Sequence, residues 1–151
     1  MRSIQELKTL YRSLGRSVTP QRLCVWKILE NNPKHPTAES IYAEARKEIE
    51  SISLKTVYQI LHELEDLGEI TSVEVGTGAL RYDPNVGKKH HHLVCTQCKL
   101  VKDVYYSSPS LNLPEGITEG FEIKEAEVIF KGLCKECAKL QHRKEMVGDL
   151  A

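Results

Sequence analysis

Residues 53–82 read SLKTVYQILHELEDLGEITSVEVGTGALRY, and this stretch predicts a helix followed directly by a β-hairpin. Ser53 is a favourable N-cap, one broad apolar face follows at helical spacing, and Gly68 ends the helix. Two short apolar runs, over residues 70–75 and 79–82, then flank a Gly-Thr-Gly sequence, which signals a tight hairpin. We therefore expect these two runs to be paired strands.

Three shorter helices are predicted before this stretch. Apolar residues recur at helical spacing over residues 4–14. Thr19-Pro20 supplies an N-cap and then the one helical position where proline fits without loss, and Thr37 caps a third helix that runs to Ile49. Short helices joined by brief connectors are typical of a helix-turn-helix unit, and the added hairpin predicts a winged helix.

The charge of the chain is unevenly distributed. Lys plus Arg and Asp plus Glu each number 21 in 151 residues, and this zero total by itself argues against DNA binding. The first 28 residues, however, hold six basic residues and one acidic residue, a net charge of +5. This basic block is either a solvated helix face or a source of phosphate contacts beside the polar side of the helix that starts at residue 54.

Length and composition restrict the class of protein. The chain is long enough for one ordinary domain or two small ones, which excludes a large multidomain enzyme. Its 40% hydrophobic and 28% charged residues are typical of a globular protein, and no apolar run approaches the roughly 18 residues of a membrane span. The first ten residues form no apolar signal stretch, so we expect a cytoplasmic protein whose five cysteines are thiols or metal ligands.

A change in composition marks the second half of the chain. Residues 84–89 contain a proline and a glycine, and they are predicted to be a hinge between a DNA-binding domain, 1–83, and a second domain, 90–151. In the second domain we expect two strands and a final helix, over residues 100–106, 121–130 and 135–147.

Two Cys-x-x-Cys motifs form the strongest chemical signal, Cys95 with Cys98 and Cys134 with Cys137, separated by 35 residues. Each motif brings two thiolates to one metal, and two motifs close a tetrahedral site that suits zinc. A pair of redox-active dithiols is the alternative, but a thioredoxin-like context is missing. Cys24, the fifth cysteine, lies among apolar helix residues and is predicted to be a small buried side chain.

A second ligand set is predicted from strand parity. In the run HHHLVC that ends at Cys95, His90 and His92 share one face and Cys95 points to the other. If Cys95 and Cys98 pair across their turn, Asp103 lies opposite His90. Two imidazoles and a carboxylate suit iron, manganese or zinc. A His-x-His pattern on an exposed strand is more often incidental, but the carboxylate and the adjoining zinc motif favour a metal site.

Motifs from about residue 5 to 140 match one known family in order and spacing: Thr19-Pro20-Gln21-Arg22, His35-Pro36-Thr37-Ala38, Thr56-Val57-Tyr58, Arg81-Tyr82-Asp83, His90-His91-His92 and both cysteine pairs. On these motifs the chain resembles the ferric uptake regulator family, whose members are dimeric, metal-dependent bacterial transcription repressors. The resemblance implies an α+β fold, in which an N-terminal winged helix-turn-helix domain precedes a C-terminal α/β dimerisation domain with a four-cysteine zinc site.

The resemblance also implies two metal sites. A structural zinc would bind the four cysteines of the two motifs. A regulatory metal, Fe(II) or Mn(II), would bind His35, Asp83, His90, His92 and Asp103. Of this regulatory set, only His90, His92 and Asp103 follow from the residues alone. The implied partners are a second copy of the chain, giving a homodimer, and double-stranded operator DNA.

DNA contacts are expected from the basic block and from the polar side of the helix that starts at residue 54. The expected contact residues are Arg16, Arg22, Lys55, Thr56, Tyr58 and Gln59. Tyr58 either reaches a phosphate, as its family counterpart does, or packs beneath the helix.

Three features resemble the peroxide-sensing branch of the family. Asp83 and Asp103 stand where iron-uptake regulators more usually have Glu. Gln59 stands where those regulators usually have Arg. An additional metal site of some relatives is missing, because its positions hold Lys89 and Ala126.

In the peroxide-sensing branch, peroxide reacts with bound Fe(II) and a ligand imidazole is oxidised, which here implicates His35 or His90. Iron-uptake or zinc-uptake regulation is the alternative within the family. Outside the family, a zinc hydrolase using His90, His92 and Asp103 needs an open metal position and a general base, and no His-Glu-x-x-His helix or equivalent occurs. The remaining alternative is a zinc-stabilised winged helix whose DNA binding does not depend on Fe(II) or Mn(II). We expect a regulator and not an enzyme.

Overall fold

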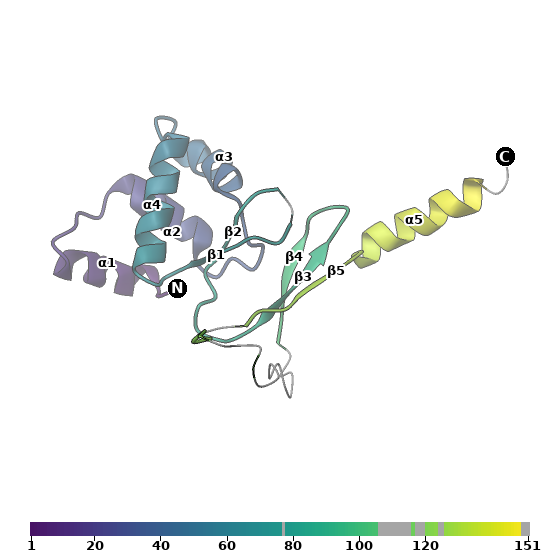
Figure 1. Ribbon diagram of the computed structural model, residues 1–151. Helices are drawn as coiled ribbons and strands as arrows, with labels where there is room; N and C mark the ends of the chain where they lie inside the picture. The colour runs from purple at the N-terminus through teal and green to yellow at the C-terminus, as the bar shows by residue number, and fades with distance from the viewer. Residues whose placement is uncertain (77, 106–115, 117–119, 124–125, 149–151) are drawn as a thin grey trace. The chain divides into compact units, whose positions relative to one another are not determined.

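The computed structural model describes residues 1–76, 78–105, 116, 120–123 and 126–148 of the 151-residue chain. The elements are α1 (Ile4–Ser13), α2 (Pro20–Leu29), α3 (Ala38–Glu48), α4 (Leu54–Asp66), β1 (Thr71–Val73), β2 (Arg81–Asp83), β3 (His91–Cys95), β4 (Val101–Val104), β5 (Ile129–Gly132) and α5 (Lys135–Gly148) (Figure 1). They belong to two compact units, unit 1 (Met1–Lys88) and unit 2 (Lys89–Ala151). Within the described ranges, no helix is both long and apolar enough to cross a membrane.

Helices α2, α3 and α4 of unit 1 begin at the predicted N-caps. The side-chain oxygens of Thr19, Thr37 and Ser53 accept hydrogen bonds from the backbone N–H three residues later, at 3.3, 3.1 and 3.0 Å. After α4, Gly68 has a φ of +67°, a left-handed conformation that ends helices and favours glycine. The four helices predicted in the first half of the chain are therefore confirmed.

The helices of unit 1 pack around one apolar core. Trp26, Tyr11 and Leu61 are completely buried in it, and the Tyr11 and Trp26 rings meet edge to face with centroids 4.7 Å apart. Burial of each such large side chain stabilises the fold by about 1.5–3 kcal/mol. Cys24 is 3% exposed in the same core, which confirms its prediction as a buried side chain.

The hairpin after α4 is present, with strands shorter than predicted. β1 and β2 pair antiparallel with Ser72 opposite Tyr82, and Thr77, which falls between them in the sequence, lies outside the described residues. The Tyr82 N–H donates to the Pro36 carbonyl at 3.0 Å, which ties the hairpin to the loop before α3. Helices α1 to α4 and this hairpin form the predicted winged helix-turn-helix.

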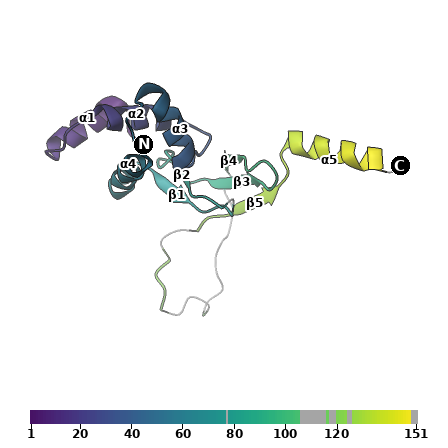
Figure 2. The same cartoon turned by 90° about the horizontal axis from the view of Figure 1, so that it is seen from above.

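Unit 2 is built on a three-stranded sheet with the strand order β4-β3-β5 (Figure 2). β3 pairs antiparallel with β4 and parallel with β5. The strand predicted over residues 121–130 is wrong for residues 121–123 and 126–128, which precede β5; residues 124–125 lie outside the described part. β5 begins later because its partner strand β3 begins only at His91, and the parallel register places Ile129 beside His92 and Gly132 beside Cys95.

The register between β3 and β4 differs from the prediction by two residues. Asp103 lies opposite His92 and not opposite His90. The turn is the reason: the Cys95 N–H donates to the Leu100 carbonyl at 2.8 Å, so Cys95 does not pair with the second cysteine of its own motif. A shift of two residues preserves side-chain parity. Asp103 therefore still shares a face with the two histidines.

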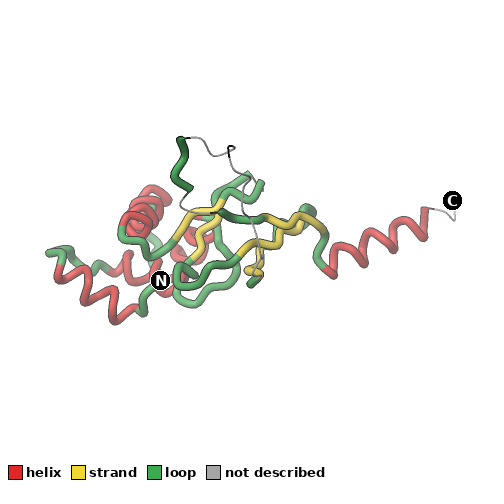
Figure 3. Tube along the Cα trace, turned by 60° about the horizontal axis from the view of Figure 1, so that its bottom comes forward, coloured by secondary structure: helices red, strands yellow, loops and turns green. Residues whose placement is uncertain are grey.

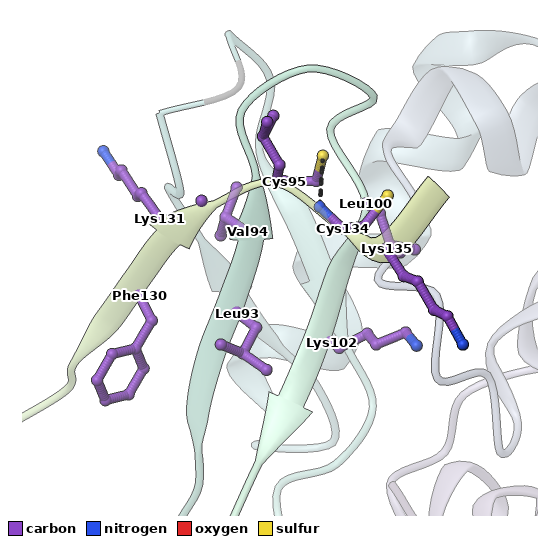
Figure 4. Close-up of a pocket in the computed structure, with 11 residues that line it drawn as sticks. Leu93, Val94, Cys95, Leu100, Lys102, Phe130, Lys131, Cys134 and Lys135 are labelled. Atoms are coloured by element: carbon purple, nitrogen blue, oxygen red, sulfur yellow. Dashed lines mark hydrogen bonds between the residues drawn. The ribbon is translucent and has the colours of Figure 1, made fainter. Parts of the chain in front are cut away.

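The other face of the unit 2 sheet exposes apolar side chains. Leu93 and Phe130 lie opposite each other in the β3–β5 register and are 45% and 41% exposed. Together with Leu100 and Leu133 they line a shallow pocket beside the strands (Figure 4). Helix α5 follows β5, which confirms the helix predicted over residues 135–147 (Figure 3).

Candidate metal centres

Unit 2 brings together the four cysteines of the two motifs. The Sγ atoms of Cys95, Cys98, Cys134 and Cys137 lie within 4.8 Å of one another, and we call this group the thiolate cluster. Cys95 ends β3 and Cys134 follows β5, so the parallel pairing of these strands carries one motif to the other. Four sulfur ligands at this spacing fit the tetrahedral coordination of zinc.

Backbone N–H groups surround the sulfur of Cys95. The Cys134 N–H donates to Cys95 Sγ at 3.3 Å (Figure 4). This hydrogen bond, followed by one from the Cys98 backbone N–H, lowers the pKa of Cys95 to about 6. Burial raises the pKa of Cys137. Because a metal binds thiolates and not thiols, metal uptake by this cluster releases protons.

A second cluster in unit 2 joins His90, His92 and Asp103, and we call it the imidazole–carboxylate cluster. The His90 and His92 rings have centroids 4.9 Å apart, and His90 Nε2 lies 3.8 Å from Asp103 Oδ1. The side chain of His92 is only 4% exposed. Tyr105 donates its hydroxyl proton to Asp103 Oδ2 at 3.3 Å, which orients this carboxylate.

Unit 1 pairs the two remaining residues of the implied regulatory set. His35 Nε2 lies 3.6 Å from Asp83 Oδ2, and both side chains are almost completely buried. His35 Nδ1 lies 3.2 Å from the Pro33 carbonyl oxygen. Because a carbonyl oxygen can only accept, Nδ1 carries a proton, and in a neutral ring Nε2 is the nitrogen that a metal can bind.

The backbone at His35 supports a functional role for this pair. Its φ is +47°, an uncommon conformation for a residue with a side chain, and such conformations concentrate at functional sites. Strand parity did not predict His35 or Asp83, because one lies in a loop and the other at the end of β2. Only the fold of unit 1 brings the two together.

The donor atoms distinguish the two clusters of unit 2. Thiolates are soft ligands that select zinc, whereas imidazole nitrogens and carboxylate oxygens suit Fe(II), Mn(II) or Zn(II). The two sets leave β3 with opposite side-chain parity, so one strand supplies ligands to both. The donor chemistry fits the two kinds of metal that the resemblance implies.

Sequence reasoning missed one contact of the imidazole–carboxylate cluster. Glu127 Oε1 contacts His92 Nδ1. Ile129 lies opposite His92 in the parallel β3–β5 register, so Glu127 precedes this pair by two residues. No motif surrounds Glu127, and the parallel pairing that brings it to His92 is not visible in the sequence.

The side of α4 expected to face DNA is polar, as predicted. Lys55 and Gln59 are exposed, and Thr56 and Tyr58 are half-buried. The ring of Tyr58 packs against the core, while its hydroxyl donates to Glu39 Oε1 at 2.9 Å. The ring of Tyr58 thus packs beneath α4, while its hydroxyl group is held at the surface by Glu39.

The two arginines expected to contact DNA have different surroundings. Arg16 is exposed, with its guanidinium carbon 6.0 Å from the centroid of the Tyr11 ring. Arg22 donates to both carboxylate oxygens of Glu63, at 2.9 and 2.7 Å, and to the Ser17 carbonyl at 2.6 Å. These three hydrogen bonds join α2 to α4 and to the loop before α2, and the expected phosphate contact of Arg22 stays a prediction.

Comparisons with known proteins agree with the fold. The model of the Ferric uptake regulator family matches residues 13–131. The chain is 32% identical over 141 residues to the transcriptional regulator FurA of Mycobacterium tuberculosis, covering 91% of this chain and 94% of FurA. It is 31% identical over 137 residues to the peroxide-responsive repressor PerR of Staphylococcus aureus, covering 89% and 90%. The solved structure of the Campylobacter jejuni peroxide stress regulator is similar with a TM-score of 0.60 and 32% identity, covering 91% of this chain and 100% of that chain.

Two of these relatives are named for peroxide and FurA is named only as a transcriptional regulator, so the comparisons identify the family and not the signal. The family match covers most of the chain, including α2 to α4 with the hairpin, the imidazole–carboxylate cluster and the first cysteine motif. The chain belongs to the ferric uptake regulator family and is a metal-responsive transcriptional regulator, not an enzyme.

Proposed function

We propose that this chain is a DNA-binding repressor whose regulatory metal, Fe(II) or Mn(II), is held by His35, Asp83, His90, His92 and Asp103. The thiolate cluster would hold a structural zinc. The observation that carries the proposal is the separation of donor chemistry between the two faces of the unit 2 sheet, with the Cys95 sulfur on one face and the His92 nitrogen and Asp103 oxygen on the other. One strand then supports a permanent metal and an exchangeable one.

The division of the regulatory set between the two units suggests how the metal controls DNA binding. His35 and Asp83 belong to unit 1, and His90, His92 and Asp103 belong to unit 2. A metal bound by all five residues would fix one relative orientation of a DNA-binding domain, 1–83, and a second domain, 90–151, across the hinge at 84–89. Metal binding shifts the population toward that orientation only as far as other orientations bind the metal less well.

The DNA-contacting residues proposed for unit 1 are those with exposed polar groups. They are Arg16, Lys55, Thr56, Tyr58 and Gln59, and Arg22 remains a further expected contact. Exposed Arg16 and Lys55 supply positive charge for phosphates, and the amide of Gln59 suits hydrogen bonds to base edges in the major groove. A protein acting on operator DNA in this way would be cytoplasmic.

The exposed apolar face of unit 2 supports the proposed homodimer. Leu93, Leu100, Phe130 and Leu133 are between 36% and 45% exposed on this unit. Apolar side chains gathered in this way mark interaction surfaces, and two copies related by a two-fold axis bury the same patch on both partners. A dimer would also present two winged helices to two half-sites of an operator.

The decisive experiment measures operator binding as a function of the regulatory metal with the zinc retained. The probe is a duplex enriched from a random library in the presence of Mn(II). We expect its affinity to fall at least about tenfold when Mn(II) is removed, which corresponds to about 1.4 kcal/mol of coupling. Equal affinity with and without Mn(II) would instead support a metal-independent winged helix. Failure to bind any duplex with Mn(II) present would instead favour the zinc-hydrolase alternative.

A second experiment tests whether unit 1 contributes ligands. The H35A variant is expected to lose Mn(II) affinity although His35 lies outside unit 2, because a buried ligand is removed from the set. The matched control is H62A, since His62 is an exposed histidine on α4. An unchanged Mn(II) affinity in H35A, measured by calorimetry, would confine the site to unit 2 and contradict the coupling proposed above.

Within this family we propose peroxide as the signal. The support is the carboxylate type at Asp83 and Asp103, the amide of Gln59, and the similarity to proteins named as peroxide regulators. Bound ferrous iron would supply the redox chemistry that activates peroxide. In the net reaction, the O–O bond of peroxide and an imidazole C–H bond break, a C–O bond forms, the proton moves to a ring nitrogen, and water leaves. The residues expected to gain the oxygen are His35 or His90.

Mass spectrometry tests this signal. The iron-loaded and manganese-loaded proteins are treated with peroxide, and peptides containing His35 and His90 are compared. We expect one added oxygen atom on either peptide in the iron form and none in the manganese form. An iron form without added oxygen at both positions would favour iron-uptake or zinc-uptake regulation. The metal that restores operator binding at its lowest free concentration then distinguishes these two.

A further inference from the structure

We propose that Glu127 is a positioning residue for His92, holding its imidazole in the tautomer that presents Nε2 to the regulatory metal. The inference rests on the proposed function, in which His92 is a ligand. It concerns only residues of unit 2 and follows from three contacts between β3 and the segment just before β5.

The first contact fixes the proton on the His92 ring. Glu127 Oε1 contacts His92 Nδ1, and the His92 side chain is 4% exposed. An ionised carboxylate can only accept hydrogen bonds, so Nδ1 is the donor. In the neutral ring Nε2 then carries the lone pair, so Nε2 is the atom available to a metal. A carboxylate at Nδ1 also makes the imidazole a more basic ligand.

The other two contacts hold Glu127 in place. The His92 N–H donates to the Val128 carbonyl at 3.2 Å, and the Val128 N–H donates to His91 Nδ1 at 3.2 Å. The residue after Glu127 is therefore bonded on both sides to consecutive residues of β3. Because His91 Nδ1 accepts, the neutral His91 ring carries its proton on Nε2. Two neighbouring histidines are thus held in opposite tautomers by one short segment.

The same device occurs at the other buried histidine of the proposed set. His35 Nδ1 lies 3.2 Å from the Pro33 carbonyl, again an oxygen that can only accept. In both rings an oxygen fixes Nδ1 as the donor and leaves Nε2 for a metal. For His35 this oxygen belongs to the backbone, which a substitution does not remove. For His92 it belongs to the Glu127 side chain, so a single substitution removes it.

The test compares the Mn(II) affinities of variants that retain zinc. Removal of such an outer carboxylate typically weakens metal binding about 10–100-fold, and we expect a loss in this range for E127A. E127Q is expected to restore most of the affinity, because the amide oxygen can still accept from Nδ1. The matched control is E122A, which removes the same charge from an exposed position in the segment before β5. Zinc content and thermal unfolding show whether each variant is folded.

A second readout does not depend on the metal. Nitrogen NMR of the zinc-loaded protein without regulatory metal, above the pH at which the imidazoles titrate, reports the tautomer of each ring. We expect the proton on Nδ1 of His92 and on Nε2 of His91 in the unmodified chain. In E127A, His92 should become a mixture of tautomers while His91 is unchanged. A His92 proton on Nε2 in the unmodified chain would overturn the proposal.

The H92A variant separates this inference from the proposed function. If H92A binds Mn(II) as tightly as the unmodified chain, His92 is no ligand, and both the ligand set and the inference fail. If H92A loses affinity but E127A does not, the ligand set stands and the role of Glu127 is wrong. Equal losses in E127A and E127Q would also overturn a positioning role, because they would make the charge the important feature.

Discussion

Unit 1 and unit 2 are stabilised in different ways. Unit 1 has a continuous apolar core to which all four helices contribute, including completely buried Trp26, Tyr11 and Leu61. In the described part of unit 2, the buried hydrophobic side chains are Val94, Val101 and two of the four cysteines. Larger apolar residues such as Leu93 and Phe130 are exposed on the sheet face.

The difference indicates that the two units depend on different partners. A small unit without a sufficient core needs a metal, a disulfide or a second chain to remain folded. Unit 2 has a cluster suited to zinc and an apolar face suited to a second copy, whereas unit 1 has a core of its own. The contrast can be tested by removing each source of stability separately.

Loss of one zinc ligand should have the largest effect. C137A removes a buried ligand, and structural zinc contributes about 10–16 kcal/mol in small zinc-dependent folds, so we expect unit 2 to unfold and zinc to be lost. Circular dichroism should then retain the helical signal of unit 1. C24A is the control, because it also removes a buried thiol but should keep the zinc. Retention of zinc by C137A, measured by elemental analysis, would contradict the assignment.

Loss of a core side chain should affect only unit 1. W26A is expected to cost about 3–5 kcal/mol of unfolding free energy, because it leaves a large cavity beside Tyr11. Denaturant unfolding measures the change, and the zinc content should stay at one ion per chain. Release of zinc by W26A would show that the two units do not unfold independently.

A charge on the apolar face should weaken the dimer. F130D places a carboxylate on the surface formed with Leu93, and we expect the dimer to dissociate at least about tenfold more readily, a cost above about 1.4 kcal/mol. Sedimentation equilibrium measures the dissociation constant. L80D is the control, since Leu80 is 46% exposed but belongs to unit 1. A stronger effect of L80D would move the interface to unit 1.

The smallest effect concerns a carboxylate on the surface of unit 1. The pKa of Glu39 is lowered first by its own backbone N–H and then by the Tyr58 hydroxyl. A lowered pKa in the folded state gives stability above the unfolded pKa that is lost as pH falls through the folded value. In Y58F the pKa of Glu39 should rise but stay below its ordinary value, because the backbone contribution remains.

An NMR titration of the Glu39 carboxyl group measures this change. Y42F is the control, because Tyr42 lies on α3, the same helix as Glu39. The result should be the same with and without bound zinc, since unit 1 does not need it. A pKa of Glu39 that changes on zinc removal would connect the two units at this position. An unchanged pKa in Y58F would remove Tyr58 as a cause.

Local patterns predicted the elements whose causes are local. The N-caps at Thr19, Thr37 and Ser53 and the helix end near Gly68 depend on residues within one turn, and they lie where predicted. Side-chain parity on β3 was equally secure, because it depends only on alternation along one strand. For the same reason, the two-residue error in the β3–β4 register left Asp103 on the same face of the sheet as His92.

What the sequence determined by itself was therefore the winged helix, the cysteine motifs and the parity of His90, His92 and Asp103, all of which depend on short-range spacing. The family resemblance added His35 and Asp83. The tertiary structure alone decided the β3–β4 register, the late start of β5, the engagement of Arg22 by Glu63 and the approach of Glu127 to His92. These depend on pairings between residues distant in sequence, which a long turn or a parallel strand sets and no local pattern specifies.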